Sequence, residues 1–84
     1  MKTVTVYTTD YCGFCVAAKT LLKSKNIPFQ EIDVTRDQAL RQDLVKRSGQ
    51  RTVPQIFIGG ESIGGFAELK ALSDKGELAV KLAD

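Results

Sequence analysis

The chain has 84 residues and a mass of 9.2 kDa, so residues 1–84 are expected to form a single small domain. Its composition, 43% hydrophobic and 26% charged with a net charge of +2, is that of a folded protein, and its dispersed basic residues argue against a nucleic-acid partner. The chain has no histidine, which excludes a Cys-His pair, a Ser-His-Asp triad and a histidine-ligated zinc site.

The N-terminal segment is predicted to form a strand. Threonine and valine alternate at the start of the segment from Thr3 to Thr8, and the whole segment is rich in β-branched and aromatic side chains. The first residues do not resemble a secretory signal, and no segment reaches the roughly 18 apolar residues of a membrane span. We therefore expect a cytoplasmic protein with no membrane partner, in a compartment where paired cysteines are more often catalytic or metal-binding than structural.

A helix and a second strand are predicted next. After the turn Asp10-Tyr11-Cys12-Gly13, apolar residues recur at helical spacing until about Asn26, shortly before Pro28. Residues Phe29 to Val34 are the second candidate strand. A strand, a helix and a strand within about 30 residues predict a parallel βαβ unit with a right-handed connection.

The middle of the chain is predicted to form a second helix. Thr35 begins the sequence Thr-Arg-Asp-Gln, in which the threonine and Gln38 fit a capping box. Leu40, Leu44 and Val45 supply the buried face of this helix. Gly49 is expected just after its last turn, where glycine commonly ends a helix.

The last part of the chain is predicted to form a hairpin and further helical turns. Residues 55–58, Gln-Ile-Phe-Ile, are the most apolar run and the best candidate for a central strand. Gly59-Gly60 is typical of a hairpin turn and predicts an antiparallel strand over 61–63. Helical spacing resumes at Phe66 and continues to the C-terminus after a break at Gly76. The order βαβ-α-ββα predicts an α/β domain of thioredoxin-like fold, with a four-stranded mixed sheet flanked by helices on both faces.

Cys12-Gly13-Phe14-Cys15 is the reactive motif, and it lies where the first strand leads into the first helix. Free N–H groups and the helix dipole stabilise an anion there, so the thiolate of Cys12 is the predicted nucleophile. Cys15 lies one helical turn further on, where it can close a disulfide with Cys12 and act as the resolving thiol. A structural staple, an inert pair and a metal site completed from outside the chain are weaker alternatives, and redox chemistry is favoured.

Two further segments carry candidate site residues. Thr52-Val53-Pro54 precedes the candidate central strand, where a proline is expected only at an edge or a special turn. A cis bond before Pro54 would explain this position and leave the Val53 backbone free to pair with an extended substrate, whereas the alternative is an ordinary loop proline. Residues 64–68, Gly-Gly-Phe-Ala-Glu, open a helix whose N–H groups can hold a carboxylate, or they simply end the hairpin.

Taken together and in this order, Tyr11 to Cys15, Thr52 to Phe57 and Ile63 to Leu69 closely resemble the glutaredoxin family. The resemblance extends from Val4 to about Leu82, and the sequence Arg-Thr-Val-Pro-Gln-Ile-Phe-Ile at 51–58 is especially characteristic. It implies a dithiol glutaredoxin, an enzyme that uses glutathione as co-substrate to reduce glutathione mixed disulfides and protein disulfides. The implied partners are glutathione and glutathionylated or disulfide-bearing proteins, and a monomer is expected.

The resemblance also implies a role for individual residues. Cys12 would attack the substrate disulfide and Cys15 would resolve it. The implied glutathione contacts are the Phe14 ring on the cleft wall, Arg41 toward the glycine carboxylate, the Val53 main chain between Thr52 and Pro54, the N–H groups of Phe66 and Ala67 toward the γ-glutamyl carboxylate, and Glu68 toward the γ-glutamyl amine.

Some positions depart from the common family pattern. Thr9 stands where the family commonly has a lysine, so weaker glutathione binding is expected. Glu68 is longer than the usual aspartate and Ala67 lacks a polar side chain, which alters the γ-glutamyl contact. Gly13 replaces the usual proline, and this leaves open a dimer bridged by a [2Fe-2S] cluster with Cys12 as a ligand; otherwise no metal is expected. The sequence is also compatible with a redoxin reduced by a flavoprotein reductase and with a passive binding module.

Overall fold

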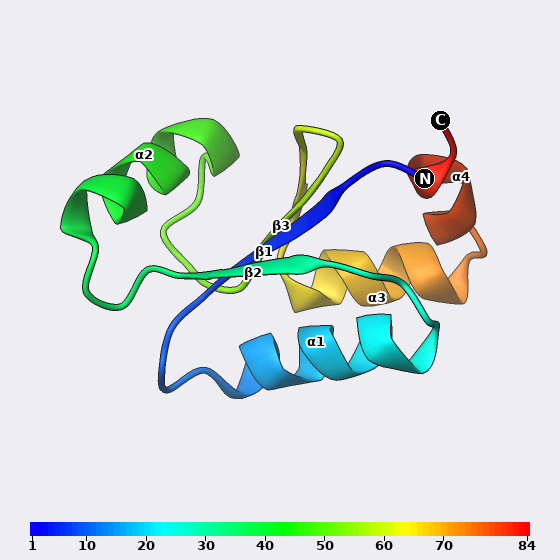
Figure 1. The fold of residues 1–84 in the computed structure, drawn as a ribbon, viewed down its shortest axis with the longest axis horizontal. Helices are drawn as coiled ribbons and strands as arrows, with labels where there is room; N and C mark the ends of the chain where they lie inside the picture. The colour runs from blue at the N-terminus through cyan, green and yellow to red at the C-terminus, as the bar shows by residue number, and fades with distance from the viewer.

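The computed structural model describes residues 1–84, and it contains four strands and four helices (Figure 1). The strands are β1 (Val4–Thr8), β2 (Gln30–Asp33), β3 (Gln55–Ile58) and β4 (Glu61–Gly64). The helices are α1 (Gly13–Ser24), α2 (Gln38–Ser48), α3 (Phe66–Asp74) and α4 (Leu78–Leu82). None of these helices combines the length and the hydropathy that crossing a membrane requires.

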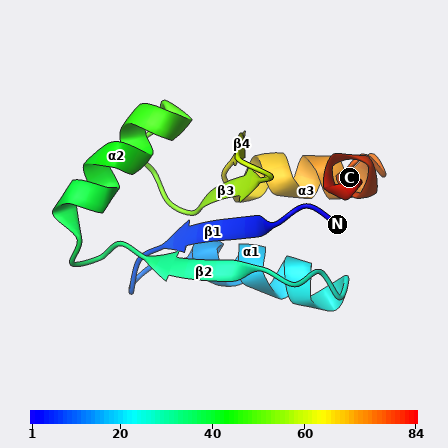
Figure 2. The same ribbon diagram turned by 45° about the horizontal axis from the view of Figure 1, so that its top comes forward.

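The strands form one mixed sheet in the order β2-β1-β3-β4. Strand β1 is parallel to β2, which confirms the predicted parallel βαβ pairing (Figure 2). It is antiparallel to β3, and β3 is antiparallel to β4. All four residues of β3 are buried, as expected for the most apolar run in the chain, and β3 is one of the two central strands.

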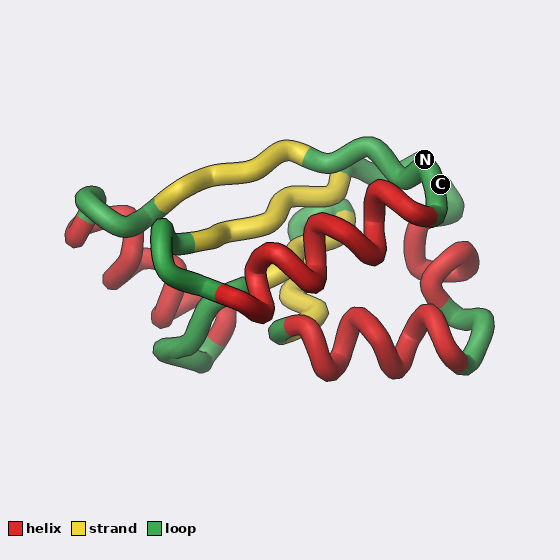
Figure 3. Tube along the Cα trace, turned by 90° about the horizontal axis from the view of Figure 1, so that it is seen from below, coloured by secondary structure: helices red, strands yellow, loops and turns green.

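Helices cover both faces of the sheet. Because successive side chains of a strand point to opposite faces, Val4 and Val6 of β1 pack on one side and Tyr7 packs on the other. Helices α1, α3 and α4 cover the first face, and α1 and α3 lie side by side there (Figure 3). Helix α2 covers the second face through Leu44, which packs with Tyr7 and Phe57. The predicted thioredoxin-like layers are therefore confirmed.

Residues with positive φ mark several turns of the chain. Asn26 has a φ of 58°, and α1 ends at Ser24, two residues earlier than predicted. Gly49 ends α2 in the left-handed conformation, with a φ of 74°, as predicted. Gly59 and Gly60 have φ values of 57° and 86°, a pair that a tight hairpin requires and that side chains disfavour.

The start of α2 differs from the prediction. The helix begins at Gln38, and its N-cap is Asp37, whose Oδ1 accepts the N–H of Leu40 at 3.0 Å. The Thr35 hydroxyl, which was predicted to cap this helix, instead accepts the N–H of Asp10 at 2.8 Å. Thr35 is therefore engaged by the loop that leads to the cysteines, and the aspartate two residues later takes the cap.

A hydrogen-bond network beneath the first helix links β1, β2 and α1. The Thr8 hydroxyl is buried, at 1% exposure, and donates to Glu31 Oε2 at 2.9 Å. Lys19 of α1 donates to the same oxygen, also at 2.9 Å. The hydrogen bond from Lys19 has the largest effect on the pKa of Glu31, and together with the weaker effect of the Thr8 hydrogen bond it holds this pKa below its usual value, although burial opposes the shift.

We expect Glu31→Gln to lower the free energy of unfolding near neutral pH by less than about 1 kcal/mol, because the ion pair is partly exposed to water. The folded-state pKa is depressed, so this stabilisation is present above the unfolded pKa of about 4.3 and is lost as the pH falls through the lower folded value. Urea unfolding of the two proteins should show a difference at neutral pH that closes in acid. A difference that persists in strong acid would mean that the carboxylate charge is not its source.

Candidate active site

Cys12 is the N-cap of α1 and lies in the short connection that follows β1. Its Sγ accepts the backbone N–H of Cys15 at 3.0 Å. The first N–H groups of a helix have no partner within the helix, so a sulfur anion at this position is stabilised by a direct donor and by the helix dipole. The local sequence therefore places one cysteine sulfur where a thiolate is favoured.

Cys12 and Cys15 form a disulfide, and their Cα atoms are 5.1 Å apart. The predicted reach of Cys15 to Cys12 is thus confirmed. The two residues differ in access, because Cys12 is half-buried whereas Cys15 is only 2% exposed and lies on the buried face of α1. An external disulfide can approach Cys12, and Cys15 can reach a group bound there only from within the protein.

The segment before β3 faces the cysteines. The peptide bond between Val53 and Pro54 is cis, as predicted, and Pro54 is buried. The carbonyl oxygen of Val53 lies 3.5 Å from Cys12 Sγ. Two chain segments separated by about 40 residues therefore meet at this sulfur, and a reduced Cys12 thiol could donate to the Val53 carbonyl.

Seven of the eight residues predicted to contact glutathione line one cleft of about 260 Å³. Its lining consists of Phe14, Thr52, Val53, Pro54, Gly65, Phe66, Ala67 and Glu68. The rings of Phe14 and Phe66 stack on one another at the cleft, with centroids 6.1 Å apart and planes at 25°. The cleft therefore has an aromatic wall on one side and the backbone of the segment before β3 on the other, beside Cys12.

The start of α3 forms one end of this cleft. Gly65 is the N-cap, and its N–H donates to Glu68 Oε1 at 2.8 Å, so Glu68 caps the helix from within its first turn. This structural role was not predicted for Glu68. An added Cβ at Gly65 would lie 3.3 Å from the Pro54 carbonyl oxygen, so the close approach of the two segments favours glycine. The N–H groups that open the helix, at Phe66 and Ala67, lie at the cleft.

Arg41 is the predicted contact that lies outside this cleft. It is an exposed residue of α2 and lines a separate hollow of about 240 Å³. Arg51, one residue before Thr52, lines the same hollow, together with Gln38, Gln42 and Val45. The linings of the two hollows are therefore adjacent in the sequence at Arg51 and Thr52, and the second hollow contains two arginine side chains.

Gly13 is not required by packing, because an added Cβ there would meet no atom within 4 Å. No three His, Cys, Asp or Glu side chains come together in the chain, so its own residues do not complete a metal site. The [2Fe-2S] dimer suggested by Gly13 would need ligands from a second chain and from glutathione, and it stays a prediction.

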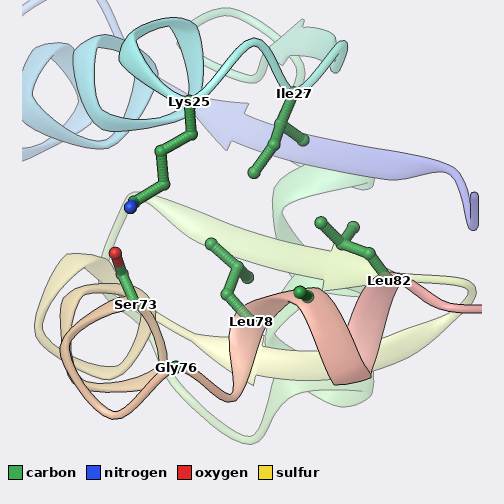
Figure 4. A pocket seen from close by; sticks show the side chains of 7 residues that line it. Lys25, Ile27, Ser73, Gly76, Leu78 and Leu82 are labelled. Atoms are coloured by element: carbon green, nitrogen blue, oxygen red, sulfur yellow. The ribbon is translucent and has the colours of Figure 1, made fainter.

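A larger hollow, of about 450 Å³, lies at the C-terminal end of α1, opposite to the end that Cys12 caps (Figure 4). Lys25 and Ser73 point toward one another on one side of it, and Ile27, Leu78 and Leu82 line it with apolar surface. Cys12 caps the opposite end of the 12-residue helix, about 18 Å away along its axis. This hollow contains no thiol or carboxylate, so we do not assign the chemistry to it.

A four-stranded mixed sheet with a Cys-x-x-Cys disulfide at the start of its first helix defines a thiol-disulfide oxidoreductase of thioredoxin-like fold. Residues 4–63 match the model of the glutaredoxin family. The chain belongs to the glutaredoxin family. Its members are thiol-disulfide oxidoreductases for which glutathione dependence is typical, and the predicted family and activity are confirmed.

Similar proteins come from bacteria and plants. Glutaredoxin 3 of Escherichia coli strain K12 is 46% identical over 78 residues, which cover 93% of this chain and 94% of that protein. The solution structure of glutaredoxin from Brucella melitensis is 44% identical, with a TM-score of 0.87 over 98% of this chain and 89% of that one. The crystal structure of a buckwheat glutaredoxin-glutathione complex is 32% identical, with a TM-score of 0.89 over 96% of this chain and 76% of that one.

Proposed function

We propose that this glutaredoxin reduces glutathione mixed disulfides and protein disulfides in the cytoplasm, as a monomer, with glutathione as its co-substrate. The observation that carries the proposal is the cleft beside Cys12, which seven of the predicted glutathione contacts line together. The buckwheat relative forms a complex with glutathione, which is consistent with the same ligand here.

The reaction begins at Cys12. Its thiolate attacks the glutathione sulfur of a mixed disulfide, so a Cys12-glutathione disulfide forms and the substrate sulfur leaves as a thiolate that takes up a proton. The thiolate of a second glutathione then attacks the bound glutathione sulfur. Oxidised glutathione leaves, and the electron pair returns to Cys12 as a thiolate stabilised by the N–H of Cys15.

Cys15 supplies a second route to the product. Its thiolate attacks the Cys12 sulfur, which releases glutathione or a substrate protein as a thiolate and leaves the Cys12–Cys15 disulfide. Two glutathione molecules then return this disulfide to two thiols and leave as oxidised glutathione. The intramolecular route suits protein disulfides, because both substrate sulfurs must leave reduced.

The backbone groups of the cleft would orient glutathione. The main chain of Val53, between Thr52 and Pro54, would pair with the cysteinyl residue and hold its sulfur beside Cys12. The stacked rings of Phe14 and Phe66 would exclude water from one side of the bound tripeptide.

The charged ends of glutathione would meet opposite charges. The N–H groups of Phe66 and Ala67, at the positive end of α3, would hold the γ-glutamyl carboxylate. One carboxylate oxygen of Glu68 accepts the N–H of Gly65, and the second oxygen remains for the γ-glutamyl amine. Arg41, from the neighbouring hollow, would attract the glycine carboxylate.

Turnover of a small glutathione mixed disulfide tests this function. The parent protein should sustain turnover with glutathione as the reductant, and more slowly or not at all with a flavoprotein thioredoxin reductase in its place. The reverse preference would contradict the proposal and favour a redoxin that a flavoprotein reduces. Visible absorbance after anaerobic purification would separately test for a [2Fe-2S] cluster.

A further inference from the structure

Gln55, the first residue of β3, is a buried polar residue for which the reaction has no direct use. It is 0% exposed, and its side-chain hydrogen bonds all go to the loop between α2 and β3. The Nε2 group donates at 2.9 Å to Gln50 Oε1 and at 2.9 Å to the carbonyl oxygen of Thr52. The Thr52 hydroxyl lies 3.4 Å from the same nitrogen.

The orientation of this amide is fixed by its partners. The NH₂ group has two hydrogens, and a backbone carbonyl such as that of Thr52 can only accept, so the nitrogen must face the loop. The other amide atom, Gln55 Oε1, is buried and has no hydrogen-bond partner. Turning the amide around would place this oxygen against the Thr52 carbonyl oxygen and would lose the bond.

An unpaired buried oxygen reduces the stability of a fold, and an apolar side chain of the same length would avoid the loss. Gln55 therefore keeps a destabilising atom in the sheet while its NH₂ group holds a loop. The Thr52 carbonyl precedes Val53, whose own carbonyl lies 3.5 Å from Cys12 Sγ. The bond from Gln55 thus fixes the peptide unit adjacent to the one at the nucleophile.

The other end of the loop is also tied down. The Gln50 backbone N–H donates to the Ser48 hydroxyl at 3.1 Å, and this hydroxyl donates to the Gln50 carbonyl at 3.1 Å. Gln50 is thereby held to Ser48, the last residue of α2. The amide of Gln55 donates to both Gln50 and Thr52, and so it links the two residues. Thr52 is otherwise exposed, so without Gln55 its carbonyl would be free to turn toward water.

We propose that Gln55 is a positioning residue, whose amide holds the Thr52 carbonyl so that the Val53 backbone is presented to a substrate at Cys12. The inference rests on the proposed glutathione-dependent function. It assigns Gln55 a role in substrate affinity that is separate from the stability of the fold and from the reactivity of the thiol.

Gln55→Met tests the proposal, because methionine keeps the length of the side chain and removes both amide atoms. We expect KM for a glutathione mixed disulfide to rise by about three- to tenfold, the range expected for the loss of one net hydrogen bond, with little change in kcat. The pH profile of Cys12 alkylation by iodoacetamide should match that of the parent, and the urea midpoint should be equal or higher. The matched control is Gln30→Met, an exposed glutamine of β2, which should leave all four quantities unchanged.

An unchanged KM in folded Gln55→Met would overturn the proposal. It would also be overturned if the urea midpoint fell and the fraction of unfolded protein accounted for the whole loss of activity. If Gln55→Met does not fold, Gln50→Met gives a second test, because Gln50 is exposed and supplies only one of the three acceptors of the Gln55 amide. We expect its KM to rise by about twofold, from loss of part of the same network, and an unchanged KM would count against the proposed role of Gln55.

The proposal can be separated from the proposed function. If the parent does not turn over glutathione mixed disulfides, the function fails, and the role of Gln55 is judged by the NMR order parameter of the Val53 N–H vector, which reports backbone motion without needing a hydrogen bond. A lower order parameter in Gln55→Met than in the parent and in Gln30→Met supports a loop held by Gln55. Equal order parameters in the three proteins contradict it.

Discussion

Cys12→Ser is expected to show no glutathione-dependent turnover above the rate of the uncatalysed exchange, whereas Cys15→Ser is expected to keep most of the parent rate with a small glutathione mixed disulfide. The physical reason is the difference in access. Cys12 is half-buried beside the cleft, and Cys15 is 2% exposed, so an external disulfide meets only the first sulfur. A serine hydroxyl at position 12 does not ionise near neutral pH and cannot form the mixed disulfide. Coupled consumption of NADPH through glutathione reductase measures both rates.

A protein disulfide substrate provides the complementary measurement. Two electrons must reach this substrate, and the reduced Cys12 and Cys15 thiols supply them together, so Cys15→Ser should lose more activity here than with the small substrate. Full activity of Cys12→Ser in either assay would contradict the assignment of the nucleophile. A Cys15→Ser variant that is silent with the small substrate would instead mean that glutathione does not release Cys12, and a redoxin reduced by a flavoprotein would then be favoured.

The fold was predictable where a local pattern coincided with the tertiary structure. Residues 55–58 are buried at every position because β3 is covered on both faces, and the two glycines after it supply the positive φ values of the hairpin. The start of α2 was predicted wrongly because the hydroxyl of Thr35, the expected cap, is occupied by a long-range contact. It accepts the N–H of Asp10, which lies 25 residues away in the chain.

The site was predictable in part from residue chemistry. A cysteine pair at the start of a helix indicates a thiolate on physical grounds alone. The approach of the Val53 backbone to Cys12 was predicted from the proline before the central strand and a cis bond there, and the structure confirms it. That Phe66 lines the same cleft as Val53 was predicted only through the resemblance to glutaredoxins, since no local pattern encodes it.

Two features of the site depend on contacts that the sequence does not display. Glu68 caps α3 because a glycine, which has no capping side chain, precedes the helix. In the sequence, Gln55 is the one polar residue of the apolar run 55–58. Only the structure shows that its amide is buried and directed at the loop that carries Val53.

Leu22→Ala is expected to lower the free energy of unfolding by about 3 kcal/mol. Leu22 is 0% exposed and lies on the face of α1 that packs against the sheet, among the nine buried residues of the main core cluster. Truncation removes apolar contacts and leaves a cavity that neighbours from several elements cannot all fill. A domain of this size has a total stability of about 5 to 10 kcal/mol, so the variant should be substantially unfolded at a urea concentration that leaves the parent folded.

Val80→Ala is the matched control, because it truncates a branched side chain of α4 that is 73% exposed, and it should change the free energy by less than about 0.5 kcal/mol. Equal effects of the two substitutions on the urea midpoint would contradict the location of the core between α1 and the sheet.

The turnover rate of Leu22→Ala tests whether this packing also affects the active site, since Cys12 is the N-cap of the same helix. If Leu22 only supports the fold, the specific activity per folded molecule of Leu22→Ala should equal the parent value. A lower value would mean that packing at the middle of α1 also sets the geometry at its N-terminus, where the sulfur accepts the Cys15 N–H.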